Sequence, residues 1–591
     1  MKQIRLILLL CLSNVSLNAA TYTVSNGNDA GNGSLREAIM SANTSAGLDN
    51  ILFSYAGIIN LVSALPDITD PIIIDGASAP GYAVCGAPVV AIDGGGLAGN
   101  GFIFRVGSSG SSVNALNVRN FGFDGINMVG VDDLSITSCY IGTDITGMTA
   151  MGNQRNGILM EPSCSRIKIG GAGCEGNIIS GNLLKGVAIN TGDAIEVKGN
   201  YIGLNAIGTS AISNITGGIL ALDSENIIIG GSLDSEKNIV SGNGQGLTGN
   251  GIDLNRTPNS SVLGNYVGLD VTGNIGIGNA ENGISILASP GIAIGGSGIN
   301  EGNIISDHNF HAIVLNGQSD NAVVQGNKCG TNAAGTNIIP NDDSGIIVIN
   351  TSGTLIGGAT DALANQFCAS ASEYGIFIIA SNNTTIQGNF IGTDFTETLS
   401  LGNFAGGIRV DFGSPQNIIG GPNQGEGNTI AYNQGAGVLV GSAADDEVLI
   451  SQNSIFCNVG KGINLNALGN GNHPSPVIET ANSLGSAGTS LPNQLIELFI
   501  DDGCQASPQG KEFIATVMSD GSGNWTYEGF LEGNITAVAI DPGNNNTSEF
   551  SALTSVTFVS RDLPVINRWR LAILALLLLI TSMILMVKTK F

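Results

Sequence analysis

Positive charge is scarce in this sequence. Its 591 residues include 21 lysines and arginines against 47 aspartates and glutamates, which gives a formal net charge of −26. A chain this acidic has little to attract the phosphates of a nucleic acid or an anionic membrane surface. We therefore expect no nucleic-acid partner, and the composition favours a soluble exported protein that can meet cations.

Histidine is also scarce, so sites built on imidazole ligands have few candidates. Two of the three histidines, His308 and His311, lie close enough in sequence to share a metal ion. His308, however, falls in a column of corner asparagines in the repeat described below, which favours a structural role. We predict no catalytic, cofactor-binding or metal-binding residues, and Ca²⁺ is the one ion that the acidic loops would suit.

Helix signals are nearly absent, whereas one strand phrase recurs throughout the chain. The phrase is Gly, apolar, any residue, apolar, as in Gly283 to Ile286, and it occurs thirteen times between residues 101 and 465 at gaps of 24 to 33 residues, once with Ala312 in place of Gly. A fixed period is typical of a repeat architecture, and the alternation has the period of a strand. The sequence therefore predicts an all-β fold of stacked coils, each with three strands and three corners.

Stacking places like residues above like residues. The residue after each glycine is apolar and should form one inward ladder, which runs Ile126, Ile158, Val187, Ile219, Ile252, Ile284, Ile313, Ile346, Ile376, Ile408 and Val438. Corner asparagines fall into two columns, one with Asn200, Asn265, Asn327 and Asn389, the other with Asn182, Asn243 and Asn433. Asparagine tolerates left-handed backbone, and stacked amides can bond to one another.

This pattern resembles the right-handed parallel β-helix proteins. The resemblance implies a β-helix of about 12 to 13 coils over residues 71–472. Before it, Ser34 to Asn43 is similar to the Ser-Leu-Arg-Glu-Ala segment at the N-terminus of many secreted bacterial β-helix proteins, although Gly33 stands where a Cys usually precedes the Ser. We expect residues 21–70 to form a cap with a short helix, whose N-cap is Ser34 or Asn32, over the apolar end of the coils.

The composition changes after His473, and residues 473–560 alternate as short strands separated by turns. This pattern predicts a small immunoglobulin-like β-sandwich with Trp525 in its core.

The two ends of the chain carry export signals. Residues 1–20 have basic, apolar and small-residue sections in the order of a secretory signal peptide. Leu571 to Val587 is an uncharged run of seventeen residues that just spans a bilayer as one transmembrane helix. Together they predict an exported protein, at the cell surface or secreted, with a C-terminal membrane anchor before any processing.

The tail at 561–591 also resembles the sorting tails of Gram-negative secreted proteins. Leu563, Pro564 and Trp569 carry this resemblance, which implies an exosortase-type processing enzyme as a partner. Ile566-Asn567 departs from the Thr-Leu that more commonly follows the Pro. A permanent anchor is the plain alternative.

The outward positions of the Gly phrase offer no cluster of residues suited to catalysis. This column holds two charges, Asp253 and Arg409, which lie five coils apart and cannot act together. The acidic pairs Asp132-Asp133, Asp342-Asp343 and Asp445-Asp446 fall in corner loops and are interpreted as solvated charge. A further loop column holds Asp144, Asn205, Asp270, Asn332 and Asp394, whose two-coil spacing of about 10 Å is too long for one shared ion and favours Asx turns.

Eight of nine cysteines remain after signal cleavage. Cys164 and Cys174 bracket one corner and could form a disulfide in an oxidising compartment, whereas Cys329 occupies an inward position and should be a buried thiol.

Two functions fit these features. We favour an exported, surface-associated protein with a structural or adhesive role, whose partner is a polysaccharide or cell-surface glycan. The alternative is a polysaccharide lyase or glycoside hydrolase, because several β-helix families are such enzymes. An enzyme would need charged residues that converge from adjacent coils.

Overall fold

A computed structural model describes residues 19–245, 248–559, 576–578 and 580. The predicted signal peptide, except residues 19 and 20, and the sorting residues Leu563, Pro564 and Trp569 lie outside these ranges. Within them, no helix is long and apolar enough to cross a membrane. Most of the predicted spanning run at 571–587 also lies outside them, so the anchor stays a prediction.

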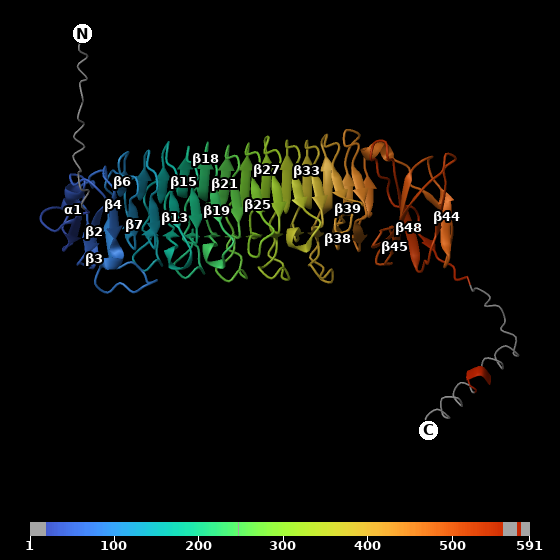
Figure 1. Ribbon diagram of the computed structural model, residues 1–591, viewed down its shortest axis with the longest axis horizontal. Coiled ribbons are helices and arrows are strands. Elements are labelled where there is room, and N and C mark those ends of the chain that lie inside the picture. The colour runs from blue at the N-terminus through green and yellow to red at the C-terminus, as the bar shows by residue number, and fades with distance from the viewer. Residues whose placement is uncertain (1–18, 246–247, 560–575, 579, 581–591) are drawn as a thin grey trace, which may run out of the picture.

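The chain winds into a long rod whose sides are three parallel sheets (Figure 1). Sheet A has fifteen strands: β1 (Thr21–Val24), β2 (Asp49–Phe53), β4 (Ile72–Asp75), β7 (Ser112–Asn114), β10 (Ser135–Thr137), β13 (Lys168–Gly170), β16 (Glu196–Lys198), β19 (Ile228–Gly230), β22 (Ser261–Leu263), β25 (Ala293–Gly295), β28 (Val323–Gln325), β31 (Leu355–Gly357), β34 (Thr385–Gln387), β37 (Ile418–Gly420) and β40 (Leu449–Ser451).

Sheet B has fourteen strands: β3 (Gly57–Asn60), β5 (Val90–Asp93), β8 (Asn117–Arg119), β11 (Tyr140–Ile141), β14 (Ile178–Ile179), β17 (Tyr201–Ile202), β20 (Ile239–Val240), β23 (Tyr266–Val267), β26 (Ile304–Ile305), β29 (Lys328–Cys329), β32 (Gln366–Phe367), β35 (Phe390–Ile391), β38 (Thr429–Ala431) and β41 (Ser454–Phe456).

Sheet C carries the Gly phrase and has thirteen strands: β6 (Phe102–Phe104), β9 (Ile126–Met128), β12 (Ile158–Met160), β15 (Lys185–Asn190), β18 (Gly217–Leu222), β21 (Ile252–Asn255), β24 (Ile284–Leu287), β27 (Ile313–Asn316), β30 (Ile346–Ile349), β33 (Tyr374–Ile379), β36 (Gly406–Asp411), β39 (Ala436–Val440) and β42 (Ile463–Leu465).

The predicted parallel β-helix is therefore confirmed. The thirteen phrases correspond to the thirteen strands of sheet C, and Ile252, Ile284 and Ile313 are stacked in register and fully buried. Parallel crossovers are almost always right-handed, so we retain that hand as a prediction. The coils begin earlier than the predicted residue 71, because β1 already pairs with β2 in sheet A.

Asparagine ladders hold two of the three corners. Between sheets A and B, each side-chain amide donates to the next side-chain oxygen at 2.8 to 3.0 Å, through Asn177, Asn200, Asn238, Asn265, Asn303, Asn327, Asn365, Asn389, Asn428 and Asn453. All ten are buried. The predicted column is thus confirmed and has a member in each of ten successive coils, so buried corner amides are satisfied by one another.

The second ladder follows sheet B and includes His308. Its Nδ1 accepts from the backbone N–H of Asn279, and its own backbone N–H donates to Asn341. Burial lowers the pKa of His308 to about 4, so the ring is neutral at physiological pH. The predicted corner role of His308 is confirmed. His311 lies in a separate corner row, where its Nδ1 accepts from the N–H of Ser344.

The N-terminal end is covered by α1 (Leu35–Ala42). Ser34 is its N-cap, as predicted, and its hydroxyl oxygen accepts from the N–H of Glu37. The carboxylate of Glu37 accepts in turn from the N–H of Gly33. Leu35, Ile39 and their neighbours are buried against the first coil. Arg36 pairs with Asp29 at 2.6 Å.

The C-terminal end is covered by a small antiparallel domain. One sheet contains β43 (Val477–Asn482), β44 (Gly485–Thr489) and β47 (Asn524–Glu528); the other contains β46 (Glu512–Met518), β45 (Leu495–Asp501), β48 (Asn534–Ile540) and β49 (Thr554–Ser555). Trp525 is buried between them, as predicted. The immunoglobulin-like topology stays a prediction.

This domain also ends both asparagine ladders. The side chain of Gln509 binds Asn458, and Glu497 accepts from Ser451 and Gln452 beside the last member of the other ladder.

The cysteine prediction was wrong. Cys174 pairs with Cys85, and Cys164 is a buried thiol. The pairing was not evident from the sequence, because Cys85 lies 89 residues before Cys174. The loop that carries Cys85 belongs to an earlier coil, and stacking of the coils brings it close to Cys174. Cys457 and Cys504 form a second bridge, whereas Cys329 is buried and free, as predicted.

Candidate functional site

The outer face of sheet B carries a row of aromatic rings. Its strands are two or three residues long along most of the rod, and in each the second residue faces the core while the first lies on the outer face, where the aromatic residues are half-buried and the residues between them are buried. Successive outward residues are Tyr140, Ile178, Tyr201, Ile239, Tyr266, Ile304, Lys328, Gln366, Phe390 and Thr429. Tyr140, Tyr201 and Tyr266 therefore recur at every second coil, about 9.6 Å apart at ~4.8 Å per strand, and Phe390 continues this spacing after Lys328.

The tight turn after each of these strands depends on glycine. Gly203, which follows Tyr201 and Ile202, has a φ of 92°, and a Cβ there would lie 2.4 Å from the side-chain oxygen of Asn243. The Gly-Asn-aromatic-apolar-Gly motif thus sets both the corner amide and the outward ring.

One side of this row is bounded by a continuous wall of hairpin loops, here called the loop wall. It consists of residues 143–150, 204–211, 269–276, 331–338 and 393–400, each closed by an antiparallel bridge. Neighbouring loops bond directly, as the N–H of Ala206 donates to Gly147 and that of Val271 to Gly208, both at 2.9 Å. Ala333 bonds to Gly273 in the same way, at 2.8 Å, so the first four loops form one hydrogen-bonded row along the rod.

The Asx turns predicted for these loops are confirmed. The Oδ1 of Asp144 accepts from the backbone N–H of Met148 and Thr149, and Asp270 accepts equivalent bonds. These bonds lower the pKa of both carboxyl groups against the opposing effect of burial. The carboxylate oxygens of Asp144 and Asp270 are thus engaged in hydrogen bonds that hold the loops of the loop wall in their shape.

The opposite side is bounded by short turns between sheets A and B. These include η2 (Gly173–Glu175), η3 (Asp234–Glu236) and η4 (Asp361–Leu363). We call the strip of outer face between these turns and the loop wall the furrow; it follows the row of first strand residues from Tyr140 to Phe390.

Two hollows open along the furrow. The first, of about 230 Å³, is lined by Tyr140 and Tyr201 and by the disulfide between Cys85 and Cys174. The second, of about 260 Å³, is lined by Tyr266, Lys328 and several glycines. Both hollows repeat the same arrangement of ring, glycine and turn.

The tyrosine rings are half-buried and carry free polar ends. Burial raises the pKa of Tyr140 and Tyr201. In the described part of the chain, neither hydroxyl has a hydrogen-bond partner. The Lys237 ammonium lies 3.9 Å above the centre of the Tyr266 ring and pairs with Asp234 at 2.7 Å. Such rings offer an apolar surface beside a polar group, which suits the C–H face and hydroxyls of a sugar.

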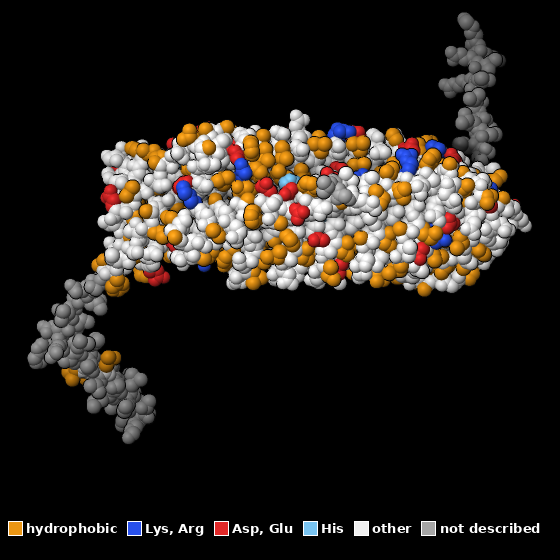
Figure 2. All heavy atoms as spheres, turned by 180° about the vertical axis from the view of Figure 1, so that it is seen from behind, with side chains coloured by type: hydrophobic (Ala, Val, Ile, Leu, Met, Phe, Trp, Pro, Cys, Tyr) orange, Lys and Arg blue, Asp and Glu red, His pale blue; other side chains and the backbone are white. Residues whose placement is uncertain are grey.

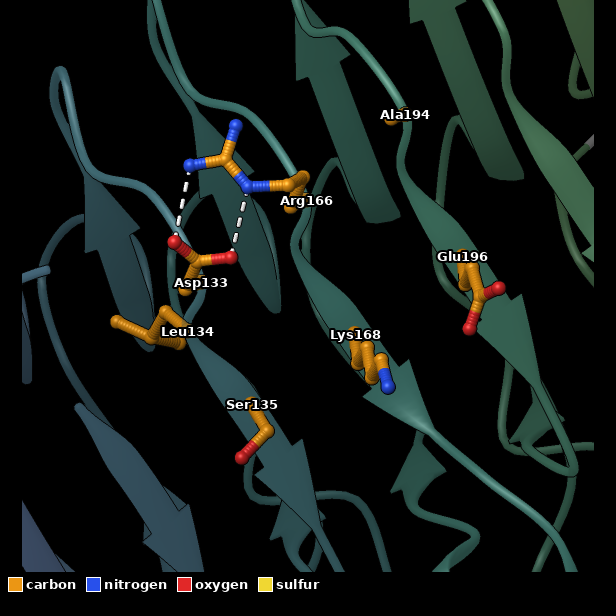
Figure 3. A pocket seen from close by; sticks show the side chains of 7 residues that line it. All are labelled: Asp133, Leu134, Ser135, Arg166, Lys168, Ala194 and Glu196. Carbon is orange, nitrogen blue, oxygen red and sulfur yellow. Dashed lines mark hydrogen bonds and ion pairs between the residues drawn. The ribbon is translucent and has the colours of Figure 1, made fainter. Parts of the chain in front are cut away.

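A larger hollow of about 530 Å³ opens on sheet A, but it is lined mainly by charge (Figure 3). Arg166 forms two bonds with Asp133, at 2.7 and 2.9 Å, and this pair lowers the pKa of Asp133. Lys168 is stacked in register beside Glu196, which also pairs with Lys198. The interpretation as solvated charge holds for Asp133, although Arg166 of the next coil pairs with it, but it was wrong for Asp445, which is buried and accepts from the N–H groups of Gly413 and Ser414. The lining residues include no aromatic ring.

On sheet C, Asp253 and Arg409 lie far apart, as predicted, but each has neighbours that the sequence analysis missed. Burial raises the pKa of Asp253, and Lys185 opposes that shift. Burial likewise lowers the pKa of Lys185, with Asp253 and Glu281 opposing it. These three residues come from three different coils.

Arg409 is enclosed by aromatic rings and by acid. Its guanidinium lies 4.8 to 5.6 Å from the centres of Tyr374, Phe377 and Phe412, and its Nε donates to Asp411 at 3.0 Å. Its Nε and Nη2 both bind Asp411, so this side of the guanidinium is used within the protein.

Acids of adjacent coils gather beside Arg409. Burial raises the pKa of Glu373, and Asp343 adds to that shift while Arg409 opposes it. Asp343 also accepts from Ser372 and lies 4.0 Å from His311. The prediction that this face has no converging charges was thus wrong. The missed signal is a charged residue one or two positions before the Gly phrase, as in Glu281, His311 and Glu373.

Comparisons with known proteins do not place the chain in a family. No family model matches it, and no curated protein matches it. Solved structures resemble it only weakly. A periplasmic alginate epimerase shares 12% identity over 64% of this chain and 76% of its own, with a TM-score of 0.36.

Two further structures show the same level of similarity. The A-module of a mannuronan C-5 epimerase from Azotobacter vinelandii shares 11% identity over 76% of this chain and 96% of its own, with a TM-score of 0.30. A tailspike protein from an Escherichia coli bacteriophage shares 10% identity over 87% of this chain and 65% of its own, with a TM-score of 0.31. The β-helix assignment rests on the strand pairing itself.

Proposed function

We propose that this chain is an exported, surface-associated right-handed β-helix protein that binds an extended polysaccharide along the furrow of sheet B. Its role is structural or adhesive. The observation that carries the proposal is the row of Tyr140, Tyr201 and Tyr266, which repeats at two-coil spacing between the loop wall and the short turns.

The repeat of the furrow favours a polymer over a small molecule. An extended glycan also presents one face of its sugar chain at regular intervals, and a two-sugar unit is comparable in length to two coils. Each ring would contribute a weak contact to the apolar C–H face of a sugar. Linking several such contacts along one chain raises the overall affinity far above that of a single contact.

The location follows from the ends of the sequence. A signal peptide would export the rod, and the tail with Leu563, Pro564 and Trp569 would hold it in the membrane until an exosortase-type enzyme transferred or released it.

The test is a glycan array with the purified ectodomain, followed by calorimetry on the strongest ligand. Tyr201→Leu should weaken binding about tenfold, because the ring contact is lost while an apolar residue remains. Phe530→Leu is the matched control, since Phe530 is 69% exposed in the C-terminal domain. Equal affinity of the Tyr201 variant and the wild type would contradict the proposal.

A second candidate function is polysaccharide cleavage on sheet C. Glu373 favours it, because a carboxyl group with a raised pKa beside another acid and an arginine is a candidate general acid. Product analysis of the bound glycan, with Glu373→Gln as the variant, distinguishes the two. Products that vanish in this variant would establish cleavage; an intact glycan after long incubation would leave binding alone.

A further inference from the structure

Lys328 stands where the row of rings would place its fourth member. The outward residues at two-coil spacing are Tyr140, Tyr201, Tyr266, Lys328 and Phe390, so one cation interrupts a series of rings. It lies in the middle of the furrow and lines the same 260 Å³ hollow as Tyr266.

The ammonium of Lys328 contacts a backbone oxygen and lies near an aromatic ring. Its Nζ donates to the backbone oxygen of Ala333 at 2.7 Å, and it lies 5.8 Å from the centre of the Phe395 ring. In the part of the chain that the structure describes, no carboxylate forms an ion pair with it. Burial alone lowers its pKa, with no opposing charge.

The other lysine of this hollow is different. Lys237 lies over Tyr266 and is neutralised by Asp234. Lys328 is therefore the uncompensated cation of the hollow, in a chain with a net charge of −26 that offers many acids. A half-buried cation without a counter-ion raises the free energy of the unliganded protein, and an anion that enters the hollow would remove that cost.

We propose that the hollow beside Tyr266 and Lys328 binds an anionic group of the glycan, a carboxylate or a sulfate. This inference rests on the proposed function, because the anion is carried by the polymer in the furrow. The neighbouring ring receives the apolar face of one sugar, while Lys328 pairs with the acid about two coils, or ~9.6 Å, further along. The preferred ligand is thus an acidic polysaccharide.

A purely structural role gives a different expectation. If Lys328 only fastens the loop wall through Ala333, its replacement lowers the thermal stability and affects acidic and neutral glycans alike. If it binds an anion, the replacement removes the preference for acidic glycans, and the effect diminishes as salt is added.

The experiment compares matched acidic and neutral glycans on the full ectodomain. The probes are uronic-acid polymers with their carboxyl-reduced forms, and sulfated glycans with their desulfated forms. We expect the bound members to be acidic and to bind about tenfold more tightly than their neutral partners at low salt. The two sets of probes distinguish a carboxylate from a sulfate ligand.

Lys328→Met should abolish that tenfold preference, with Lys328→Arg retaining it. Lys168→Met is the matched control, because Lys168 lies on the outer face of sheet A. Melting curves show whether each variant is folded. If glycans bind with dependence on Tyr201 but acidic and neutral forms bind equally, the inference on Lys328 fails and the proposed function stands. If no glycan binds, both fail.

Discussion

Sheets B and C belong to the same coils but carry different chemistry on their outer faces. On sheet B the outward aromatic residue is part of the repeat motif, so rings recur in register with the coils. On sheet C the charges of Glu281, Asp343 and Glu373 come from corners outside the Gly phrase and gather in separate clusters. Figure 2 shows charged side chains scattered among neutral ones on the visible face, not in one broad patch. The comparison teaches that a periodic face suits a polymer, whereas an irregular one can build only local sites.

The largest effect on glycan binding is expected when two rings are removed from sheet B. Tyr201→Leu combined with Tyr266→Leu should weaken glycan binding by about a hundredfold, because two ring contacts on one polymer are lost together. Calorimetry measures the affinity. Phe377→Leu, on sheet C, should leave it unchanged; a comparable loss in that variant would move the binding face to sheet C.

The second largest effect is expected on the stability of the asparagine ladder between sheets A and B, the corner that aligns the rings. Asn238→Ala should lower the free energy of unfolding by about 2 kcal/mol, because Asn200 and Asn265 each lose a buried partner. Urea denaturation measures it, and Asn337→Ala, at an exposed loop position, is the control. Equal stability of the two variants would show that the ladder contributes little.

The ladder after sheet B should respond to acid through His308. Its pKa is about 4 in the folded protein and near 6.5 when unfolded. Below pH 6.5 the unfolded chain gains a proton that the folded chain does not, so stability falls as the pH drops from 6.5 to 4. His308→Asn should remove this contribution, of roughly 3 kcal/mol at its limit. Thermal melts of both proteins across that range measure the difference; identical pH profiles would contradict it.

The smallest effect is expected at the hollow of sheet A. Asp133→Asn breaks an ion pair with Arg166 that is fully exposed to solvent, so it should change neither stability nor glycan binding measurably. A clear loss of binding in this variant would show that the furrow is not the only glycan site.

Much of the fold was predictable because the repeat period and the alternation of apolar residues can be recognised in the sequence. The Gly phrase marked the strands of sheet C, and the asparagine columns marked two corners, down to the substitution by His308. The pairing of Cys85 with Cys174 was not predictable, since it depends on which long loop folds back onto the stack.

The candidate site was harder to predict than the fold. The aromatic position of Tyr201 was evident in its motif, but its outward direction and the walls beside it depend on how loops of alternate coils contact one another. The clusters around Asp253 and Arg409 were missed because their partners come from neighbouring coils at other positions of the repeat. These contacts depend on how the coils stack, and a single sequence does not show which positions of neighbouring coils meet.

The most direct test of the account is a crystal structure of the ectodomain with an oligosaccharide derived from its strongest glycan ligand. We predict a sugar chain that runs parallel to the rod axis along sheet B, with sugars against Tyr201 and Tyr266 and an acidic group within hydrogen-bond distance of the Lys328 Nζ. A sugar chain bound across sheet C beside Glu373 and Arg409, with the furrow empty, would contradict it.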